Sequence, residues 1–166
     1  MSLTVRTARL EDASGIVDVL NPIIEAGVFT VLDQPLTEAA QQEFISRFPE
    51  RGIFLVAVEN QDDKIVGLQS MEPFASYTRA FDHVGVIGTF VDLTRRRRGT
   101  ATRLFHATFD RAREKGYEKL HTFIRGDNPA ALAAYMRHGF RIVGTAQRQA
   151  KLRGNYIDEI IVERFL

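Results

Sequence analysis

The sequence predicts an α/β protein in which a mixed β-sheet is covered by helices. The expected elements run in the order strand, two helices, three strands, helix, strand, helix and two strands. Strand–helix–strand passages in the second half imply a mixed sheet with helices packed on it. Hydrophobic residues make up 45% of the chain and charged residues 26%, as in ordinary globular proteins. A chain of 166 residues can bury a sizeable core, so we expect one domain over residues 1–166.

The first quarter of the chain predicts a strand followed by a helix. Residues 3–9 alternate weakly between apolar and polar side chains, which is typical of a strand. Apolar side chains with helical spacing then predict a helix over residues 12–26. We expect Pro22 to bend or divide this helix, because proline lacks the N–H that the helix needs there. Residues 27–35 are expected to form a loop.

A second helix and a β-hairpin are expected next. Thr37 is a good N-cap residue, and the helix that follows it should end near residues 48–49, where a proline stands. The apolar runs over residues 53–58 and 65–71 predict two strands. The polar turn over residues 61–64 joins them, so the two strands should form a hairpin.

A strand followed by an amphipathic helix is predicted in the middle of the chain. Residues 84–91 form the strand, in which Gly85 and Gly88 suggest a bulge or a close approach of another backbone. Apolar side chains then share one helical face over residues 101–112, and the helix should end near Gly116.

The last third predicts a strand, a helix and a final hairpin. The strand covers residues 119–124, and the helix covers residues 128–138 with a proline in its first turn. The hairpin consists of residues 141–150 and 155–165, with a turn at residues 152–154.

The segment over residues 91–101 predicts a phosphate site. An extended apolar run, four arginines and a glycine lead directly into a helix. A helix start carries unpaired N–H groups and a partial positive charge, and glycine allows close approach to the backbone. Amides of residues 97–102 could donate to phosphate oxygens while the arginines neutralise them. We interpret the segment as the pyrophosphate cradle of a nucleotide-like cofactor, with a solvated arginine run or a nucleic-acid patch as the alternatives.

The charge distribution favours a polyanionic ligand. Residues 95–125 contain ten basic and three acidic residues, whereas the rest of the chain contains twelve basic and eighteen acidic ones. Positive charge is therefore concentrated around one segment, which suits such a ligand more than a broad nucleic-acid surface.

A second motif lies on the helix expected over residues 128–138. Asn128 and Tyr135 are seven residues apart, about two turns, so their polar groups lie on one helix edge and could line a groove. The alternative is that Asn128 only caps the helix and that Tyr135 packs with its hydroxyl at the surface.

Together the two motifs resemble the GCN5-related N-acetyltransferases, which move an acetyl group from acetyl-CoA to an amine. In that family a Gln/Arg-x-x-Gly-x-Gly/Ala run binds the CoA pyrophosphate, and Arg96, Gly99 and Ala101 match it here. The family's second motif, Asn-x-x-Ala-x-x-x-Tyr-x-x-x-Gly-Phe, is matched by Asn128, Ala131, Tyr135, Gly139 and Phe140.

The resemblance implies a fold and a set of cofactor contacts. The fold is a mixed, mostly antiparallel sheet of about seven strands with about four flanking helices and a splayed central strand pair. Backbone groups of the parted strand would bind the pantetheine amides, and the Tyr135 hydroxyl would protonate or hydrogen-bond the departing sulfur. The residues implied to bind acetyl-CoA are Phe90, Val91, Arg96, Arg97, Arg98, Gly99, Thr100, Ala101, Thr102, Asn128 and Tyr135.

The resemblance also implies an acceptor. The chain is similar to small bacterial acetyltransferases of free amino acids and related amines, and its layout resembles that of phosphinothricin acetyltransferases. A small-molecule amine is therefore the expected acceptor, with a protein N-terminus or a lysine as the alternative. The candidates for binding it are Phe29, Thr30, Glu72 and Tyr156.

The general base is left open. A primary amine is mostly protonated at neutral pH and must lose a proton before it attacks the thioester. Val86 stands where phosphinothricin acetyltransferases have their proposed base glutamate. Glu72 and His83 are the main candidates, and Glu25 is a third.

Several other functions find no support. The chain has no cysteine, which excludes disulfides and thiolate sites. His106, His121 and His138 lack partners at metal-ligand spacing, so we expect no metal. No apolar run reaches the roughly 20 residues of a membrane span, and no secretory signal is visible, so a cytoplasmic location is expected.

Two rival functions remain at this stage. A non-catalytic acyl-CoA sensor would bind the cofactor without turnover, and a nucleic-acid-binding module would lose affinity steeply with salt. The acidic remainder of the chain argues against the second. The family often forms dimers, so a homodimer is an open option.

Overall fold

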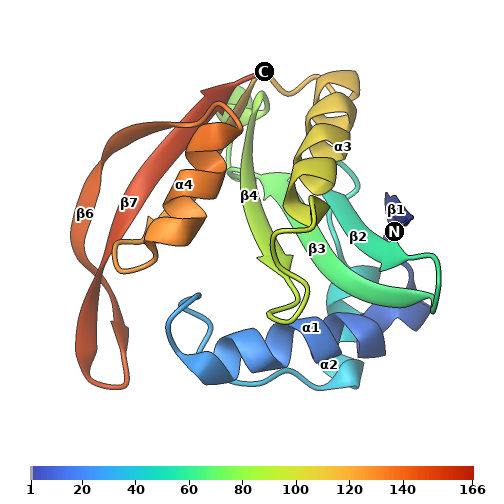
Figure 1. Ribbon diagram of the computed structural model, residues 1–166. Coiled ribbons are helices and arrows are strands. Elements are labelled where there is room, and N and C mark those ends of the chain that lie inside the picture. Colours follow the sequence, from blue (N-terminus) through green and yellow to red (C-terminus); the bar gives the residue numbers. More distant parts are fainter. Residues whose placement is uncertain (1) are drawn as a thin grey trace.

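The computed structural model describes residues 2–166, which form one seven-stranded sheet with helices on both faces (Figure 1). The strands lie in the order β1-β2-β3-β4-β5-β7-β6. The helices and strands are β1 (Leu3–Thr7), α1 (Ala13–Ala26), α2 (Glu38–Ser46), β2 (Ile53–Glu59), β3 (Lys64–Pro73), β4 (Val84–Val91), α3 (Thr100–Glu114), β5 (Lys119–Arg125), α4 (Pro129–Arg137), β6 (Arg141–Leu152) and β7 (Asn155–Phe165). Short 3-10 helices cover Leu10–Asp12 and Arg79–Phe81.

The sheet is split between β4 and β5. All other neighbouring strands are antiparallel, whereas β4 and β5 are parallel. These two strands pair only from Val84 opposite Lys119 to Val86 opposite His121. Beyond that point each strand continues without the other. The mixed, mostly antiparallel sheet with a splayed central pair, expected from the sequence, is therefore confirmed.

Two apolar cores lie on the two faces of the sheet. On one face, α3 and α4 pack over β2, β3, β4 and β5, and the buried rings of Phe105, Tyr135 and Phe140 meet there. On the other face, α1 and α2 cover β2, β3 and β4, and Ile16 and Ile24 are buried in the core there. Because side chains alternate along a strand, these three strands supply residues to both cores.

Gly67 on β3 sets how closely α3 approaches the sheet. A Cβ added there would lie 2.9 Å from Thr100 Cγ2 and 3.3 Å from Leu104 Cδ1. Such a contact is too short for carbon atoms to keep, so a side chain at this position would push the first turn of α3 away. The glycine therefore fixes the start of α3 beside β4.

Pro22 does not divide the first helix, which corrects that part of the sequence prediction. It lies inside the continuous helix α1. Proline there removes one hydrogen bond and costs about 3 kcal/mol. Burial of each large apolar side chain contributes about 1.5–3 kcal/mol, and α1 buries Ile16, Ile23 and Ile24 together with other apolar residues. Packing against the sheet therefore outweighs the local penalty.

The two glycines of β4 behave differently from the expected bulge. The ladder between β3 and β4 runs without a register shift from Gly67 opposite Val91 to Pro73 opposite Gly85, so β4 has no bulge. At Gly85 the close neighbours are side chains rather than another backbone, since an added Cβ would lie 2.5 Å from Met71 Sδ. At Gly88 the same atom would make only ordinary contacts.

Candidate functional site

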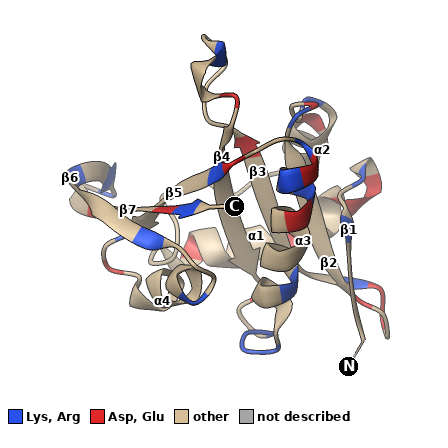
Figure 2. Cartoon of the chain, turned by 90° about the horizontal axis from the view of Figure 1, so that it is seen from above, with Lys and Arg blue, Asp and Glu red and all other residues tan. Residues whose placement is uncertain are grey.

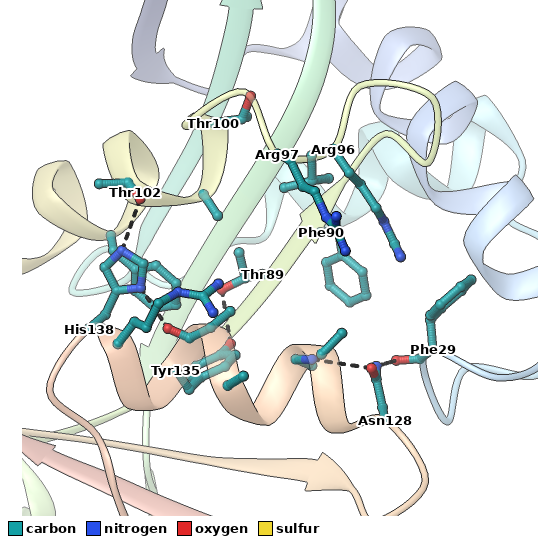
Figure 3. Close-up of a pocket in the computed structure, with 18 of the residues that line it drawn as sticks. Phe29, Thr89, Phe90, Arg96, Arg97, Thr100, Thr102, Asn128, Tyr135 and His138 are labelled. Carbon is teal, nitrogen blue, oxygen red and sulfur yellow. Dashed lines mark hydrogen bonds between the residues drawn. The ribbon is translucent and has the colours of Figure 1, made fainter.

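A cavity of about 820 Å³ lies where β4 and β5 part (Figure 3). Its walls come from the end of β4, the loop that connects β4 to α3, the first turns of α3 and one side of α4. Phe29, from the loop after α1, closes one end. The two motifs singled out in the sequence therefore face each other across one space.

The four consecutive arginines divide into two pairs. Arg95 and Arg98 form ion pairs with Glu59, the buried last residue of β2. Arg96 and Arg97 line the cavity instead (Figure 3). Glu59 thus binds the outer pair, offsets one of its two charges and holds the loop, while the inner pair supplies positive charge to the cavity. Sequence reasoning missed Glu59, because nothing in its local pattern connects it to a loop more than thirty residues later.

The start of α3 presents free backbone donors to the same cavity. Gly99 has a φ of +80°, which glycine adopts without strain, and its carbonyl accepts the first helical hydrogen bond from Arg103 N at 3.1 Å. The N–H groups of the first turn, Thr100 to Thr102, have no partner within the helix. An added Cβ at Gly99 would touch nothing within 4 Å, so the glycine serves the turn and leaves the approach to these amides open.

The cavity is electropositive. Arg96, Arg97 and Arg137 line it, and no aspartate or glutamate is among its lining residues in the described part of the chain. Figure 2 shows basic residues in the loop between β4 and α3. The Arg96 guanidinium stacks over the ring of Phe29 at 4.2 Å, and burial lowers its pKa from the ordinary value for arginine. Such a site suits an anion with several oxygens.

Asn128 does more than cap α4. Its Oδ1 accepts a hydrogen bond from Ala131 N at 3.2 Å, which is the expected N-cap interaction. Its Nδ2 also donates to the carbonyl of Phe29 at 3.3 Å (Figure 3). One side chain therefore fixes both the start of α4 and the loop that carries Phe29.

Tyr135 places its hydroxyl in the cavity wall. The residue is 6% exposed, and its ring packs edge-on against Phe105 and Phe140. Its oxygen lies 2.9 Å from Thr89 Oγ1 (Figure 3). Burial raises the pKa of Tyr135 to about 12, against a smaller lowering by the hydrogen bond with Thr89. The phenol therefore keeps its proton at any physiological pH and can act as a hydrogen-bond donor.

His138 connects the C-terminal end of α4 to the first turn of α3. Its Nδ1 lies 2.7 Å from the carbonyl of Ala134, so this nitrogen carries the proton, and its Nε2 accepts from Thr102 Oγ1 at 3.1 Å. The ring stacks on Phe105 with centroids 4.3 Å apart. Burial is the largest cause that lowers the pKa of His138. With both nitrogens occupied, this histidine is a structural link and has no free position for accepting a proton.

The structure brings the predicted cofactor residues together with one exception. Phe90, Val91, Asn128, Tyr135 and the run from Arg96 to Thr102 all line the cavity, apart from Arg98, which turns to Glu59.

The predicted acceptor and base residues are more dispersed. Phe29 lines the cavity, whereas Thr30 is held beside it by a hydrogen bond from Arg125 Nη1 to its carbonyl at 2.8 Å. Tyr156 is 59% exposed on the last hairpin, below the ammonium of Lys151.

Glu72 and His83 lie outside the cavity between β4 and α4. Glu72 is on the sheet face covered by α2 and lines a separate cavity of about 390 Å³ with Phe44 and Phe48. His83 is exposed, and its carbonyl accepts from Glu118 N at 2.8 Å at the closed end of the β4–β5 pair. Glu25, the third candidate, is exposed near the end of α1.

One titratable residue at the split was missed in the sequence. His121 stands opposite Val86 in the last paired position of β4 and β5, and Glu72 stands opposite Val86 on the other side. The side chains of His121, Val86 and Glu72 lie on the face of the sheet opposite to α3. His121 Nδ1 is buried without a hydrogen-bond partner, and the ring meets Phe74 and Phe123 edge-on. Burial, and less strongly Lys119, lower the pKa of His121, while Glu163 raises it. Only its place in the strand alternation could have indicated this position.

Within residues 2–166 the structure shows neither a metal-binding cluster nor a membrane-spanning helix. The described histidine, aspartate and glutamate side chains form no group of three that could hold a metal ion. None of the described helices has the length and apolar character needed to cross a membrane.

Comparison with known proteins gives one family. The model of the Acetyltransferase (GNAT) family matches residues 23–140, more than half of the chain. A search of curated proteins finds no match.

Many solved structures share the fold. A provisionally assigned phosphinothricin N-acetyltransferase has a TM-score of 0.89 at 26% identity over 99% of both chains. A ribosomal-protein-alanine N-acetyltransferase from Brucella melitensis has a TM-score of 0.90 at 21% identity over 98% of this chain and 99% of its own. A phosphinothricin acetyltransferase from Sinorhizobium meliloti, solved in complex with acetyl-CoA, has a TM-score of 0.89 at 20% identity over 100% and 89%.

Proposed function

The chain belongs to the Acetyltransferase (GNAT) family, and on that premise we propose that it transfers an acetyl group from acetyl-CoA to the amine of a small molecule. It is an acetyltransferase, and acetyl-CoA is its acetyl donor. The observation that carries the proposal is the shared cavity. Two arginines and the free amides of one helix start face a buried tyrosine across it.

The residues present fit acetyl-CoA. Its diphosphate requires positive charge and N–H donors, which Arg96, Arg97 and the first turn of α3 supply without a competing carboxylate in the cavity. Its pantetheine arm requires backbone donors and acceptors, and the parted end of β4 beyond Val86 has such groups unpaired by β5. The apolar wall formed by Phe90 and the alanines of α4 suits the remaining methylene groups.

Acetyl-CoA supplies an activated thioester, so the acceptor nitrogen can form a C–N bond as the C–S bond breaks and the sulfur leaves with the electron pair. Tyr135 stabilises that sulfur by donating a hydrogen bond. Complete proton transfer to it is unfavourable, because the pKa of Tyr135 is about 12 and that of a thiol is about 8.5. A backbone N–H at the parted end of β4 polarises the thioester carbonyl.

The proton of the acceptor ammonium must go to a base on the other face of the sheet. The cavity contains no carboxylate, and both nitrogens of His138 are engaged. Glu72 and His121 flank Val86 at the point where the strands part, with strands about 4.8 Å apart. These two residues are our candidates, acting directly or through water. His83 lies at the closed end of the strand pair, which makes it a weaker candidate than the sequence suggested.

The small-molecule acceptor is supported by the phosphinothricin acetyltransferases among the similar structures. A protein N-terminus is the alternative, because a ribosomal-protein-alanine N-acetyltransferase has the same fold at similar identity. Phe29 and Thr30, from the loop after α1, and Tyr156, at the start of β7, would contact the acceptor. A cytoplasmic location and a homodimer remain predictions.

A thiol-release assay tests the function directly. The protein is incubated with acetyl-CoA and a panel of amino acids, polyamines, aminoglycosides and peptides with a free N-terminus. We expect turnover with at least one small amine and lower kcat/KM for peptides. Turnover with peptides alone would contradict a small-molecule acceptor and indicate a protein acceptor. Cofactor binding without any turnover would favour an acyl-CoA sensor.

A further inference from the structure

Three side chains form a hydrogen-bonded chain from the interior of the sheet to the cavity. Gln69 on β3 is fully buried, and its Nε2 donates to Thr89 Oγ1 at 2.8 Å. Thr89 stands opposite Gln69 on β4, and its Oγ1 lies 2.9 Å from the oxygen of Tyr135 on α4 (Figure 3). The chain therefore crosses two strands and ends at the phenol that faces the cavity.

The direction of the second hydrogen bond follows from the valence of Thr89. A hydroxyl has one hydrogen to donate and two positions to accept. Gln69 already donates to Thr89. If Tyr135 also donated to Thr89, the threonine hydrogen would have no protein acceptor, since the hydrogen bonds among residues 2–166 give Thr89 Oγ1 only these two partners. If Thr89 donates to Tyr135 instead, its hydrogen is used and the tyrosine proton is left for the cavity.

The orientation of the Gln69 amide supports the same direction. As placed, Oε1 is the atom that is buried without a partner. With the amide reversed, Nε2 would be buried without a partner, leaving both of its N–H groups unpaired. Unpaired buried N–H groups are rarer in proteins than carbonyl oxygens without a donor. The placed orientation is therefore the more favourable one.

We propose that Gln69 and Thr89 are positioning residues that direct the Tyr135 hydroxyl proton at the sulfur leaving from acetyl-CoA. This inference rests on the proposed function. The three donors point the same way, from Gln69 to Thr89, from Thr89 to Tyr135, and from Tyr135 into the cavity. Hydrogen bonds in such a series strengthen one another by about 10–30% each. The two buried residues thus make Tyr135 a better donor than the same phenol alone.

The consequence can be measured on bound CoA, without knowing the acceptor. A hydrogen bond from Tyr135 stabilises the thiolate of CoA and lowers the pKa of its thiol. The protein is saturated with CoA, and the ultraviolet absorbance of the thiolate is followed against pH. The variants are Thr89→Val, which keeps the shape and removes the hydroxyl, Thr89→Ser, which restores it, and Tyr135→Phe. Thr145→Val, on the exposed strand β6, is the matched control.

We expect Tyr135→Phe to lower the acid dissociation constant of the bound thiol at least tenfold, because the thiolate loses a hydrogen bond to its charged sulfur. Thr89→Val should lower it about threefold, Thr89→Ser should restore most of that change, and the control should leave it as it was. Thr89→Val added to Tyr135→Phe should cause no further change, because the donor that it serves is already absent.

Two results would overturn the inference. One is an unchanged dissociation constant of the CoA thiol in Thr89→Val beside a clear change in Tyr135→Phe. The other is an equal effect of Thr89→Val in the parent protein and in Tyr135→Phe. A reversed chain, in which Tyr135 donates to Thr89, predicts that Thr89→Val frees the tyrosine proton and raises the dissociation constant. If Thr89→Val does not fold, Gln69→Leu gives the same comparison with the threonine intact. Absence of CoA binding in the parent protein would contradict the proposed function instead.

Discussion

The two faces of the split sheet differ in how completely they are organised. On the face of α3 and α4, several polar side chains have defined partners: Glu59 pairs with two arginines, Asn128 binds the loop that carries Phe29, and Thr89 is hydrogen-bonded to Tyr135. On the face of α1 and α2, Glu72 and His121 stand on either side of an apolar residue with no hydrogen bond between them. Fixed polar contacts on the face of α3 and α4 suit a cofactor that is the same in every reaction. The proposed acceptor would supply the partners that Glu72 and His121 lack on the face of α1 and α2.

The largest expected effect concerns the face of α3 and α4, where the cofactor is proposed to bind (the cofactor face). Gly99→Glu places a carboxylate at the start of α3 and forces a side chain into a φ of +80°. Charge repulsion and lost access to the amides should weaken CoA binding at least 100-fold, measured by calorimetry. Gly144→Glu, on β6 where an added Cβ meets nothing within 4 Å, is the control for the introduced charge. Normal CoA affinity in Gly99→Glu would refute a phosphate site at this helix start.

Tyr135→Phe should retain cofactor affinity and lose turnover. The ring keeps its packing against Phe105 and Phe140, so the fold is preserved. Loss of the donor to the leaving sulfur should lower kcat about 100-fold while the KM for acetyl-CoA changes less than threefold. An equal kcat at saturating substrates would remove Tyr135 from the chemistry.

Substitutions on the face of α1 and α2, where the acceptor is proposed to bind (the acceptor face), should change how activity depends on pH. His121→Gln and Glu72→Gln are compared over a range of pH in single-turnover reactions with the best amine of the panel. If His121 takes the proton, activity falls as pH drops through its pKa, which burial places below the ordinary value for histidine. That acidic limb should disappear in His121→Gln, with kcat/KM about tenfold lower near neutral pH. The charge of Lys119 lowers the pKa of His121 and that of Glu163 raises it, so these two side chains move the midpoint. An unchanged profile in both variants would place the base elsewhere.

The smallest expected effect is a difference in CoA affinity between variants of the arginines that line the cavity and a variant of Arg98. Arg96→Ala and Arg97→Ala should each weaken CoA binding about tenfold, and less so at high salt, because each loses a charge that faces the cavity. Arg98→Ala should change the affinity less than threefold, since its side chain forms an ion pair with Glu59. Equal losses in all three variants would indicate that total charge, rather than position, governs binding.

The sequence predicted the cofactor face better than the acceptor face for a physical reason. The proposed phosphate site consists of a helix start, a glycine and adjacent arginines, which are contiguous in the chain. Asn128 and Tyr135 are likewise placed by the geometry of one helix. The positions of Gln69, Thr89 and His121 relative to their neighbours depend on strand register, and Glu59 meets arginines of a loop far along the chain; no local pattern encodes either. Pro22 was misjudged for a related reason, since burial of α1 against the sheet overrides a local helix penalty.

A crystal structure of the protein with bound CoA tests the central claim most directly. The account predicts the diphosphate at the amides of the first turn of α3, between the guanidinium groups of Arg96 and Arg97, and the sulfur within hydrogen-bond distance of the Tyr135 hydroxyl. Density for CoA elsewhere on the molecule, or none at concentrations that saturate binding in solution, would contradict it.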